Sequence, residues 1–267
     1  DGKLYHRNEE IYRVTLAEKL LIPVLAKLSN LVPDGGIWMN TQRPEWNDAN
    51  NALAGWGLSM VTLAYLRRFI DFLLELFPEQ EGAELDLTAA VADMCDAMVA
   101  LLAEYEGRGE FDPEERFRFV RRAGEIGSSY RNQVYQGAFG GKRRSLSVAS
   151  IRHLLSRAKE LLDRSIRNNR RADGLYHSYN ILEVRGTGIS LGRLSEMLEG
   201  QVAVLSSGLL SPGEAAALLG ELRGSALYRS DVDSYILYPN REVPSFLEKN
   251  TLPEEIRTSD AIIETEA

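Results

Sequence analysis

The side chains best suited to chemistry gather between the first two hydrophobic segments of the chain. All three tryptophans, Trp38, Trp46 and Trp56, lie in this loop or just after it, among asparagine, glutamine, aspartate, glutamate and arginine residues. A sugar ring packs its C–H face on an indole, while planar amide and carboxylate groups hold its hydroxyls. This composition predicts a carbohydrate-binding loop. The alternative is structural: the tryptophans close the end of a helical bundle, and Asn and Asp cap the next helix.

One short stretch of this loop resembles a known catalytic sequence. Trp46-Asn47-Asp48, preceded by Glu45 and followed by Ala49-Asn50-Asn51, is similar to the Asp-Trp-Asn-Asp-Gly-x-Asn loop of the cellobiose and chitobiose phosphorylases. More broadly, it resembles the catalytic loops of inverting glycosidases built on an (α/α)6 toroid. The likeness covers fewer than ten residues, with Glu45 in place of Asp and Ala49 in place of Gly. It implies that Asp48 is the general acid that protonates the glycosidic oxygen, and that Trp46 contacts the sugar.

Hydrolysis with inversion needs a second carboxylate, which lies roughly 6.5–9.5 Å from the acid and activates a water molecule. The segment Phe246-Leu247-Glu248-Lys249-Asn250 resembles the Phe-Glu-Lys segment that carries the base in trehalase-like toroid enzymes. The resemblance implies Glu248 as the base, and Glu45 is the other candidate. The alternative for Glu248 is a solvated side chain near the start of a helix.

A phosphorylase would use inorganic phosphate in place of water and would need no base. The phosphate would then require cationic or N–H groups. The segment Gly140-Gly141-Lys142-Arg143-Arg144, just ahead of an expected helix, offers both kinds of group. The alternative for this segment is a flexible turn with a solvated basic end.

A second polar loop, residues 173–180, predicts further contacts to sugar hydroxyls through Tyr176, His177 and Tyr179. Alternatively, the two tyrosines pack beneath the loop with their hydroxyls bonded to backbone. No cofactor is expected, and no metal site, since three histidines and one cysteine offer few ligands. The residues expected to shape the sugar subsite are Trp38, Arg43, Trp46, Asn47, Asn50, Tyr176, His177 and Tyr179.

Apolar residues recur at helical spacing through seven segments, so the chain is expected to be mainly α. Helices are expected over roughly 9–31, 51–77, 86–105, 113–135, 146–168 and 190–205, with a seventh beginning at Ser211. The segment 51–77 is apolar nearly all round, which predicts a helix buried on several sides. Residues 231–238 predict a short strand.

These helices and short polar loops predict an all-α fold of helical hairpins. The expected architecture is a complete or partial (α/α) toroid with minor short strands, in a single domain over residues 1–267. Residues 1–6 echo residues 173–177, as hairpins repeated around an axis would. A complete toroid has twelve helices, against about seven expected here. The chain is then either a fragment of a longer catalytic module or a reduced relative.

The composition limits the partners of the chain. The 39 Asp and Glu residues exceed the 31 Lys and Arg residues, which gives a net charge of −8 and disfavours nucleic acid and anionic membranes as partners. No apolar span is long enough to cross a bilayer, and no targeting pattern is present. The single cysteine, Cys95, excludes an internal disulfide. A soluble protein is expected, and these features are compatible with a cytoplasmic location.

The sequence therefore predicts a carbohydrate-active enzyme, a glycoside hydrolase or phosphorylase, that cleaves an oligosaccharide or glycoside with inversion. Asp48 would be its general acid. The alternative is a non-catalytic helical module that binds a glycan or a protein partner through the same face. The feature that separates the two is a second carboxylate facing Asp48 across an open cleft.

Overall fold

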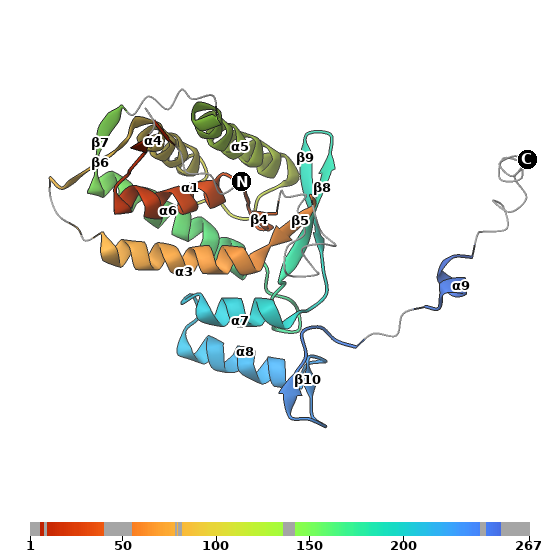
Figure 1. Ribbon diagram of the computed structural model, residues 1–267. Helices are drawn as coiled ribbons and strands as arrows, with labels where there is room; N and C mark the ends of the chain where they lie inside the picture. Colours follow the sequence, from red (N-terminus) through yellow and green to blue (C-terminus); the bar gives the residue numbers. More distant parts are fainter. Residues whose placement is uncertain are drawn as a thin grey trace, which may run out of the picture.

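The computed structural model describes residues 6–7, 10–39, 55–77, 79, 82–135, 142–240 and 244–251. Over these residues the chain is a mixed α/β protein, in which an antiparallel sheet stands beside a body of packed helices (Figure 1). The helices are α1 (Leu16–Leu28), α3 (Met60–Leu76), α4 (Ala89–Ala103), α5 (Pro113–Tyr135), α6 (Val148–Arg167), α7 (Leu198–Ser206), α8 (Pro212–Gly224) and α9 (Phe246–Lys249). The strands are β1 (His6–Arg7), β2 (Glu10–Ile11), β3 (Leu31–Val32), β4 (Gly36–Trp38), β5 (Gly57–Ser59), β6 (Glu84–Thr88), β7 (Arg143–Ser147), β8 (Tyr179–Arg185), β9 (Gly188–Arg193), β10 (Tyr228–Arg229) and β11 (Ser234–Tyr235).

The prediction of an all-α toroid is wrong, because five strands form one curled antiparallel sheet in the order β3-β4-β5-β8-β9. The longest pair, β8 and β9, occupies a region where a helix was expected to begin at Ser190. Gly186 has a φ of 59°, which lets the chain reverse through a two-residue turn, so that Arg185 pairs with Gly188. Leu182 then faces Leu191 across the pair, and the apolar residues alternate with a period of two rather than 3.6.

Several helices begin where the sequence predicts, because their first turns are capped locally. Pro113 opens α5, and the Asp112 carboxylate accepts the N–H of Glu115 at 2.7 Å. Ser211 and Glu214 form the expected capping box of α8. The predicted helices 113–135 and 146–168 are confirmed as α5 and α6 to within about two residues.

The main hydrophobic core lies between the helices. Leu63, Ile70 and Leu73 on one face of α3 are fully buried, as are Leu154 and Leu162 of α6. Burying one such side chain contributes about 1.5–3 kcal/mol relative to leaving it exposed. The main stabilising core of the described part of the chain therefore lies among the helices.

The prediction that segment 51–77 is buried on several sides is confirmed for α3, which has several neighbours, although one of its faces is exposed. Tyr65, Phe72 and Leu76 of α3 are 46%, 50% and 45% exposed. Helix α3 contacts α6, α7, α1 and strands β4 and β8, and these described elements leave one face of the helix uncovered. Apolar residues nearly all round a helix therefore do not mean that other elements cover every side of it.

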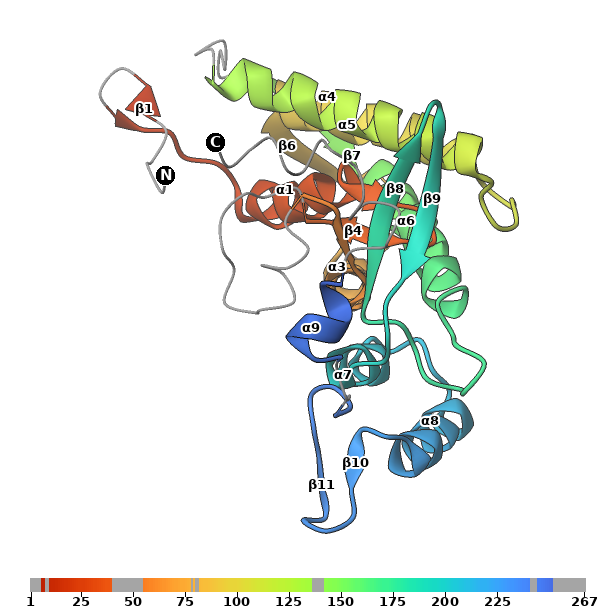
Figure 2. The same cartoon turned by 90° about the vertical axis from the view of Figure 1, so that its right-hand side faces the viewer.

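A second, smaller core joins the sheet to α5. Val32, Leu58, Leu182 and Ile189 are buried on one face of the sheet and pack with Phe117 and Val120 of α5, Leu191 and Trp38. Figure 2 shows β8 and β9 standing against α5. The sheet is thus held at the side of the helical body by its own apolar face.

The chain after the sheet forms a smaller unit in which α7 packs on α3 and α8 packs on α7. The strand predicted over 231–238 is confirmed in part, since β11 pairs with β10 through Tyr235 and Tyr228. Every residue of α9 is exposed.

Candidate functional site

The predicted carbohydrate loop connects two neighbouring strands of the sheet. Strands β4 and β5 pair antiparallel, with Trp38 opposite Leu58, and the Met39 N–H donates to the Gly57 carbonyl at 2.9 Å. The two ends of the loop therefore leave the sheet side by side. Six predicted site residues lie outside the described residues: Arg43, Glu45, Trp46, Asn47, Asp48 and Asn50.

The two described tryptophans lie at the two ends of this loop and have different surroundings. Trp38 is half-buried, packs against the smaller core and donates its Nε1–H to the Gly55 carbonyl at 3.0 Å. The Trp56 carbonyl accepts the N–H of Leu182 at 2.8 Å, while the residue as a whole is 57% exposed. The Trp38 side chain thus joins the two ends of the loop, whereas Trp56 is exposed and can contact a ligand.

A buried polar cluster centred on Asp34 lies directly before β4. Asp34 is fully buried and has a φ of 60°, a left-handed conformation that Asp and Asn tolerate better than most residues. Its carboxylate accepts the N–H of Phe111 at 3.1 Å and the Nδ2–H of Asn168 at 3.0 Å, and it lies 3.5 Å from Arg116 Nη2. Arg116 is also buried and donates to the carbonyls of Pro33 and Ile189, each at 2.9 Å.

The same cluster continues into the sheet through side-chain amides. Asn169 donates to the Asp34 carbonyl at 2.7 Å, and Asn180 of β8 donates to the Gly35 carbonyl at 2.7 Å and to Asn169 Oδ1 at 2.9 Å. Arg193 of β9 donates to the Asp34 carbonyl at 3.2 Å and also to Asn169 Oδ1. The turn that leads into β4 is therefore tied to α5, to the end of α6 and to two further strands.

The predicted second polar loop lies inside the protein rather than at the mouth of a cavity. Tyr176 and Tyr179 are each 4% exposed. The Tyr179 hydroxyl donates to the Glu199 carboxylate at 2.6 Å, and burial together with this bond raises the pKa of Tyr179. His177 is half-buried with Nδ1 2.9 Å from the Leu194 carbonyl, and burial lowers its pKa. These side chains join residues 176–179 to the chain that enters α7.

Glu248, the first candidate for the base, caps its own helix. Its carboxylate accepts the N–H of Ser245 at 2.7 Å in a capping box at the start of α9. This hydrogen bond lowers the pKa of Glu248. The surroundings of Glu248 therefore match the alternative interpretation, in which it is an exposed side chain near the start of a helix.

The basic segment proposed for phosphate contributes a strand and surface ion pairs. Residues 143–147 form β7, which pairs with β6. Arg143 forms an ion pair with Asp86, and Arg144 lies 2.7 Å from Asp96. Gly140 and Gly141 lie outside the described residues.

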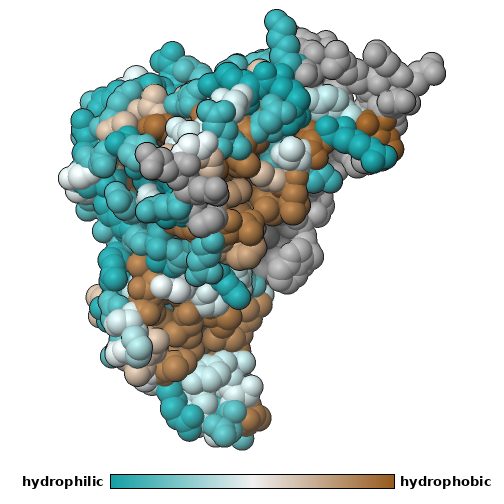
Figure 3. Space-filling view, turned by 90° about the vertical axis from the view of Figure 1, so that its left-hand side faces the viewer, coloured by the Kyte–Doolittle hydropathy of each residue, from teal (hydrophilic) through white to brown (hydrophobic). Residues whose placement is uncertain are grey.

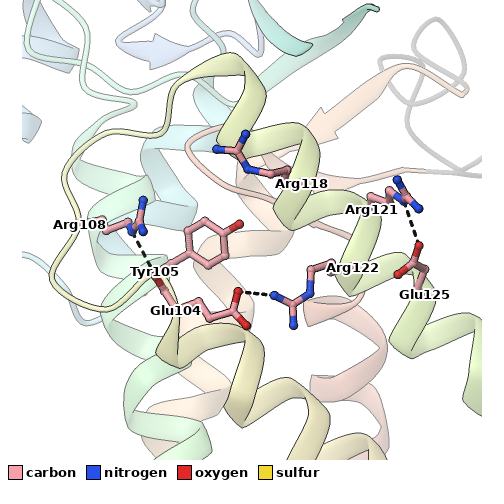
Figure 4. A pocket seen from close by; sticks show the side chains of 7 residues that line it. All are labelled: Glu104, Tyr105, Arg108, Arg118, Arg121, Arg122 and Glu125. Carbon is pink, nitrogen blue, oxygen red and sulfur yellow. Dashed lines mark hydrogen bonds and ion pairs between the residues drawn. The ribbon is translucent and has the colours of Figure 1, made fainter. Parts of the chain in front are cut away.

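A cavity of about 490 Å³ opens between the end of α4 and the exposed side of α5. Figure 4 shows Tyr105 between Arg108, Arg118 and Arg122. Each lining arginine has an acidic partner: Arg108 with Glu115, Arg118 with Glu114, Arg121 with Glu125, and Arg122 with Glu104. None of the arginines that line this cavity is therefore an unpaired cation that could bind an anion. Exposed ion pairs of this kind contribute little to the stability of the protein.

No family model matches this chain, and none of the curated proteins compared with it matches significantly. Among the described residues, no group of three His, Cys, Asp or Glu side chains is placed to hold a metal ion. No helix in the described part of the chain is long and apolar enough to span a membrane.

Sequence reasoning missed Asp34, Arg116, Asn169 and Arg193, which together hold the turn before the loop. The only local signal was the Pro33-Asp34-Gly35-Gly36 turn sequence. Arg116, Asn169 and Arg193 sit in sequence contexts typical of exposed helix and loop positions. Their role depends on contacts between residues more than seventy positions apart in the chain.

Proposed function

We propose that the chain acts on a carbohydrate through the loop between β4 and β5, and that it cleaves a glycosidic bond with inversion. Asp48 is the general acid of this proposal, and Trp46 and Trp56 bind the apolar face of the sugar. The proposal rests on one observation. The Trp46-Asn47-Asp48 stretch belongs to a loop whose two ends are held side by side by β4 and β5, and the exposed Trp56 lies at the second of these ends.

The anchoring of the loop supports a binding role. Binding and catalytic residues are often carried on loops that a rigid scaffold positions. Here the scaffold is the pair β4–β5, the bond from Trp38 Nε1 to Gly55, and the buried Asp34 cluster just before β4. A loop held at both ends loses less conformational entropy on binding than one attached to mobile chain.

The base of a hydrolytic reaction is better assigned to Glu45 than to Glu248. The Glu248 carboxylate is engaged by the N–H of Ser245, and its lowered pKa makes it a weaker base. Glu45 is three residues from Asp48, so their Cα atoms are at most about 10–11 Å apart. That reach is compatible with the roughly 6.5–9.5 Å between carboxylates of an inverting pair. In a phosphorolytic reaction, phosphate takes the place of the activated water.

The test is a screen for release of reducing sugar from α- and β-linked di- and oligosaccharides, with and without phosphate. Asp48→Asn should lower turnover by about 10²–10⁴-fold, the usual contribution of a general acid, and should leave the fold intact. Trp56→Ala should weaken sugar binding in calorimetry. Asp231→Asn, at an exposed aspartate paired with Arg229, is the control and should change neither measurement.

The outcomes separate the possible roles. Full turnover by Asp48→Asn contradicts the assignment of the acid. Sugar binding without turnover in the unmodified protein contradicts the catalytic part and favours the non-catalytic glycan-binding module. Neither binding nor turnover, in protein shown to be folded, contradicts the carbohydrate proposal as a whole.

A further inference from the structure

The outer face of α3 carries an apolar stripe that no described element covers. Tyr65, Phe72 and Leu76 are each about half exposed, and they recur at spacings of seven and four residues. Such spacing places them in one line along a helix. Figure 3, a view from the side at which α3 ends, shows areas of apolar surface among hydrophilic ones on this side of the molecule. Aligned apolar side chains of this size on a helix surface mark an interaction site.

Two opposite charges flank this stripe and have no partner. Arg68 and Glu75 are exposed, and neither makes a hydrogen bond or ion pair in the part of the chain that the structure describes. They are seven residues apart, so they lie on the same flank of the helix, about 10.5 Å from each other along its axis. Phe72 lies between them on the stripe. The other arginine of this helix, Arg67, is by contrast buried and paired with Asp163 at 2.8 Å.

We propose that this face binds a second copy of the chain, through an antiparallel two-fold pairing of α3 with α3. In a two-fold interface the same patch meets itself, so each feature must face its own complement. With the axis beside Phe72, Phe72 of the two copies meet at the centre. Arg68 of each copy then faces Glu75 of the other, and the apolar flanks lie against each other. The charge pattern is thus complementary to itself.

The same pattern argues against the parallel arrangement. A two-fold axis along the helix direction exchanges the two flanks, so Arg68 and Glu75 of each copy would face the apolar flank of the other, on the side where Leu76 lies. Neither charge would then meet an opposite charge across the interface. Only the antiparallel pairing gives both charges an opposite partner, so the charge pattern favours it.

The expected dimer is weak and reversible. Helix α3 has 17 residues and is about 25 Å long, so one helix pair falls at or below the ~1,200 Å² of the smallest standard interfaces. Monomer and dimer should exchange, with a balance that shifts with protein concentration. Added salt should favour the monomer, because the two rim ion pairs are exposed.

The test is sedimentation velocity on the full chain over a range of concentrations, with charge reversals at the two flanking positions. Arg68→Glu places acid against acid twice across the axis, and Glu75→Arg places base against base twice. Each single reversal should weaken self-association by about tenfold or more. The double variant Arg68→Glu/Glu75→Arg restores both opposite-charge contacts and should dimerise as the unmodified chain does.

Mixing gives the sharpest readout. An equimolar mixture of the Arg68→Glu and Glu75→Arg chains should form a heterodimer, although each chain alone is monomeric, because both cross-axis contacts are then of opposite charge. Arg121→Glu on α5, an exposed arginine outside this face, is the matched control and should leave dimerisation unchanged. Both flanking residues are exposed and unpaired, so their reversal should not impair folding.

Three results would overturn the proposal. The first is an unmodified chain that stays monomeric at the highest soluble concentration, which would leave the face for another partner. The second is a dimer that both single reversals leave intact, which would place the interface elsewhere. The third is failure of the double variant and of the mixture to recover association, which would exclude the antiparallel pairing.

Discussion

Replacing Asp34 is expected to destabilise the whole protein, because its carboxylate compensates the buried guanidinium of Arg116. Breaking a buried ion pair by removing one partner typically costs about 3–5 kcal/mol. Arg116 would keep three carbonyl acceptors, those of Pro33, Ile189 and Phe111, which favours the low end of this range. The buried Phe111 N–H, however, would lose its acceptor, at a cost of about 1–3 kcal/mol.

Two substitutions separate these contributions. Asp34→Asn keeps the shape and a residue that tolerates a φ of 60°, so only the charge and part of the hydrogen bonding are lost. We expect it to lower the free energy of unfolding by about 3 kcal/mol. Asp34→Ala also places an ordinary residue in a left-handed conformation, which adds about 1–2 kcal/mol. We therefore expect a loss of about 5 kcal/mol for Asp34→Ala.

The assay is denaturant unfolding followed by tryptophan fluorescence, with the slope of the transition used to confirm a single cooperative step. The matched control is Asp233→Asn, because Asp233 is the other described non-glycine residue with a positive φ, at 45°, and it is exposed. This control should change the free energy of unfolding by no more than about 0.5 kcal/mol. A loss below about 1 kcal/mol for Asp34→Asn, or an equal loss for the control, would refute the reasoning.

Three further predictions concern single positions. Gly36→Ala should lower the free energy of unfolding, measured in urea, by about 3 kcal/mol, because the added Cβ would lie 2.8 Å from the Ser59 carbonyl carbon. Gly55→Ala, with open space around the added Cβ, should lower it by only about 1 kcal/mol. The pKa of His177 is lowered from 6.5 in the folded protein, so the unfolded chain binds the proton first as the pH falls. The free energy of unfolding measured in urea should therefore fall as the pH drops below about 6.5, and His177→Gln should remove the contribution of this residue to the pH dependence. Burial raises the pKa of the Cys95 thiol to about 12, so a thiol reagent near pH 8 should label it only at the rate of unfolding; rapid labelling of the folded chain would contradict this.

The helices were largely predictable because their determinants are local. The Asp112-Pro113 start of α5 and the Ser211 capping box act within one turn, and the structure has both. The hydrogen bonds of a helix join residues four apart in the same segment, so a short stretch of sequence contains most of the information. The segment 190–205 misled for the same reason, since its apolar spacing suits a helix from Ser190 when read alone.

The sheet could not be predicted because its strands find their partners far away. Strand β5 has three residues, too few for a pattern, and pairs with β8 through Gly57 and Ile181, more than a hundred positions apart. The candidate site shares this dependence. Tyr176 and Tyr179 have the residue types of a sugar site, but only their neighbours in the fold decide that they are buried.

By itself, the sequence determined the composition, the acidic charge, most helix positions and the unusual loop that carries Trp46 and Asp48. The folded structure determines that the two ends of this loop belong to neighbouring strands, that Asp34 just before β4 is buried, and that no described element covers one face of α3. The physical reason is the range of the interactions. Helix hydrogen bonds and caps close within a few residues, whereas strand pairing, buried ion pairs and the covering of an apolar face join segments that meet only after folding.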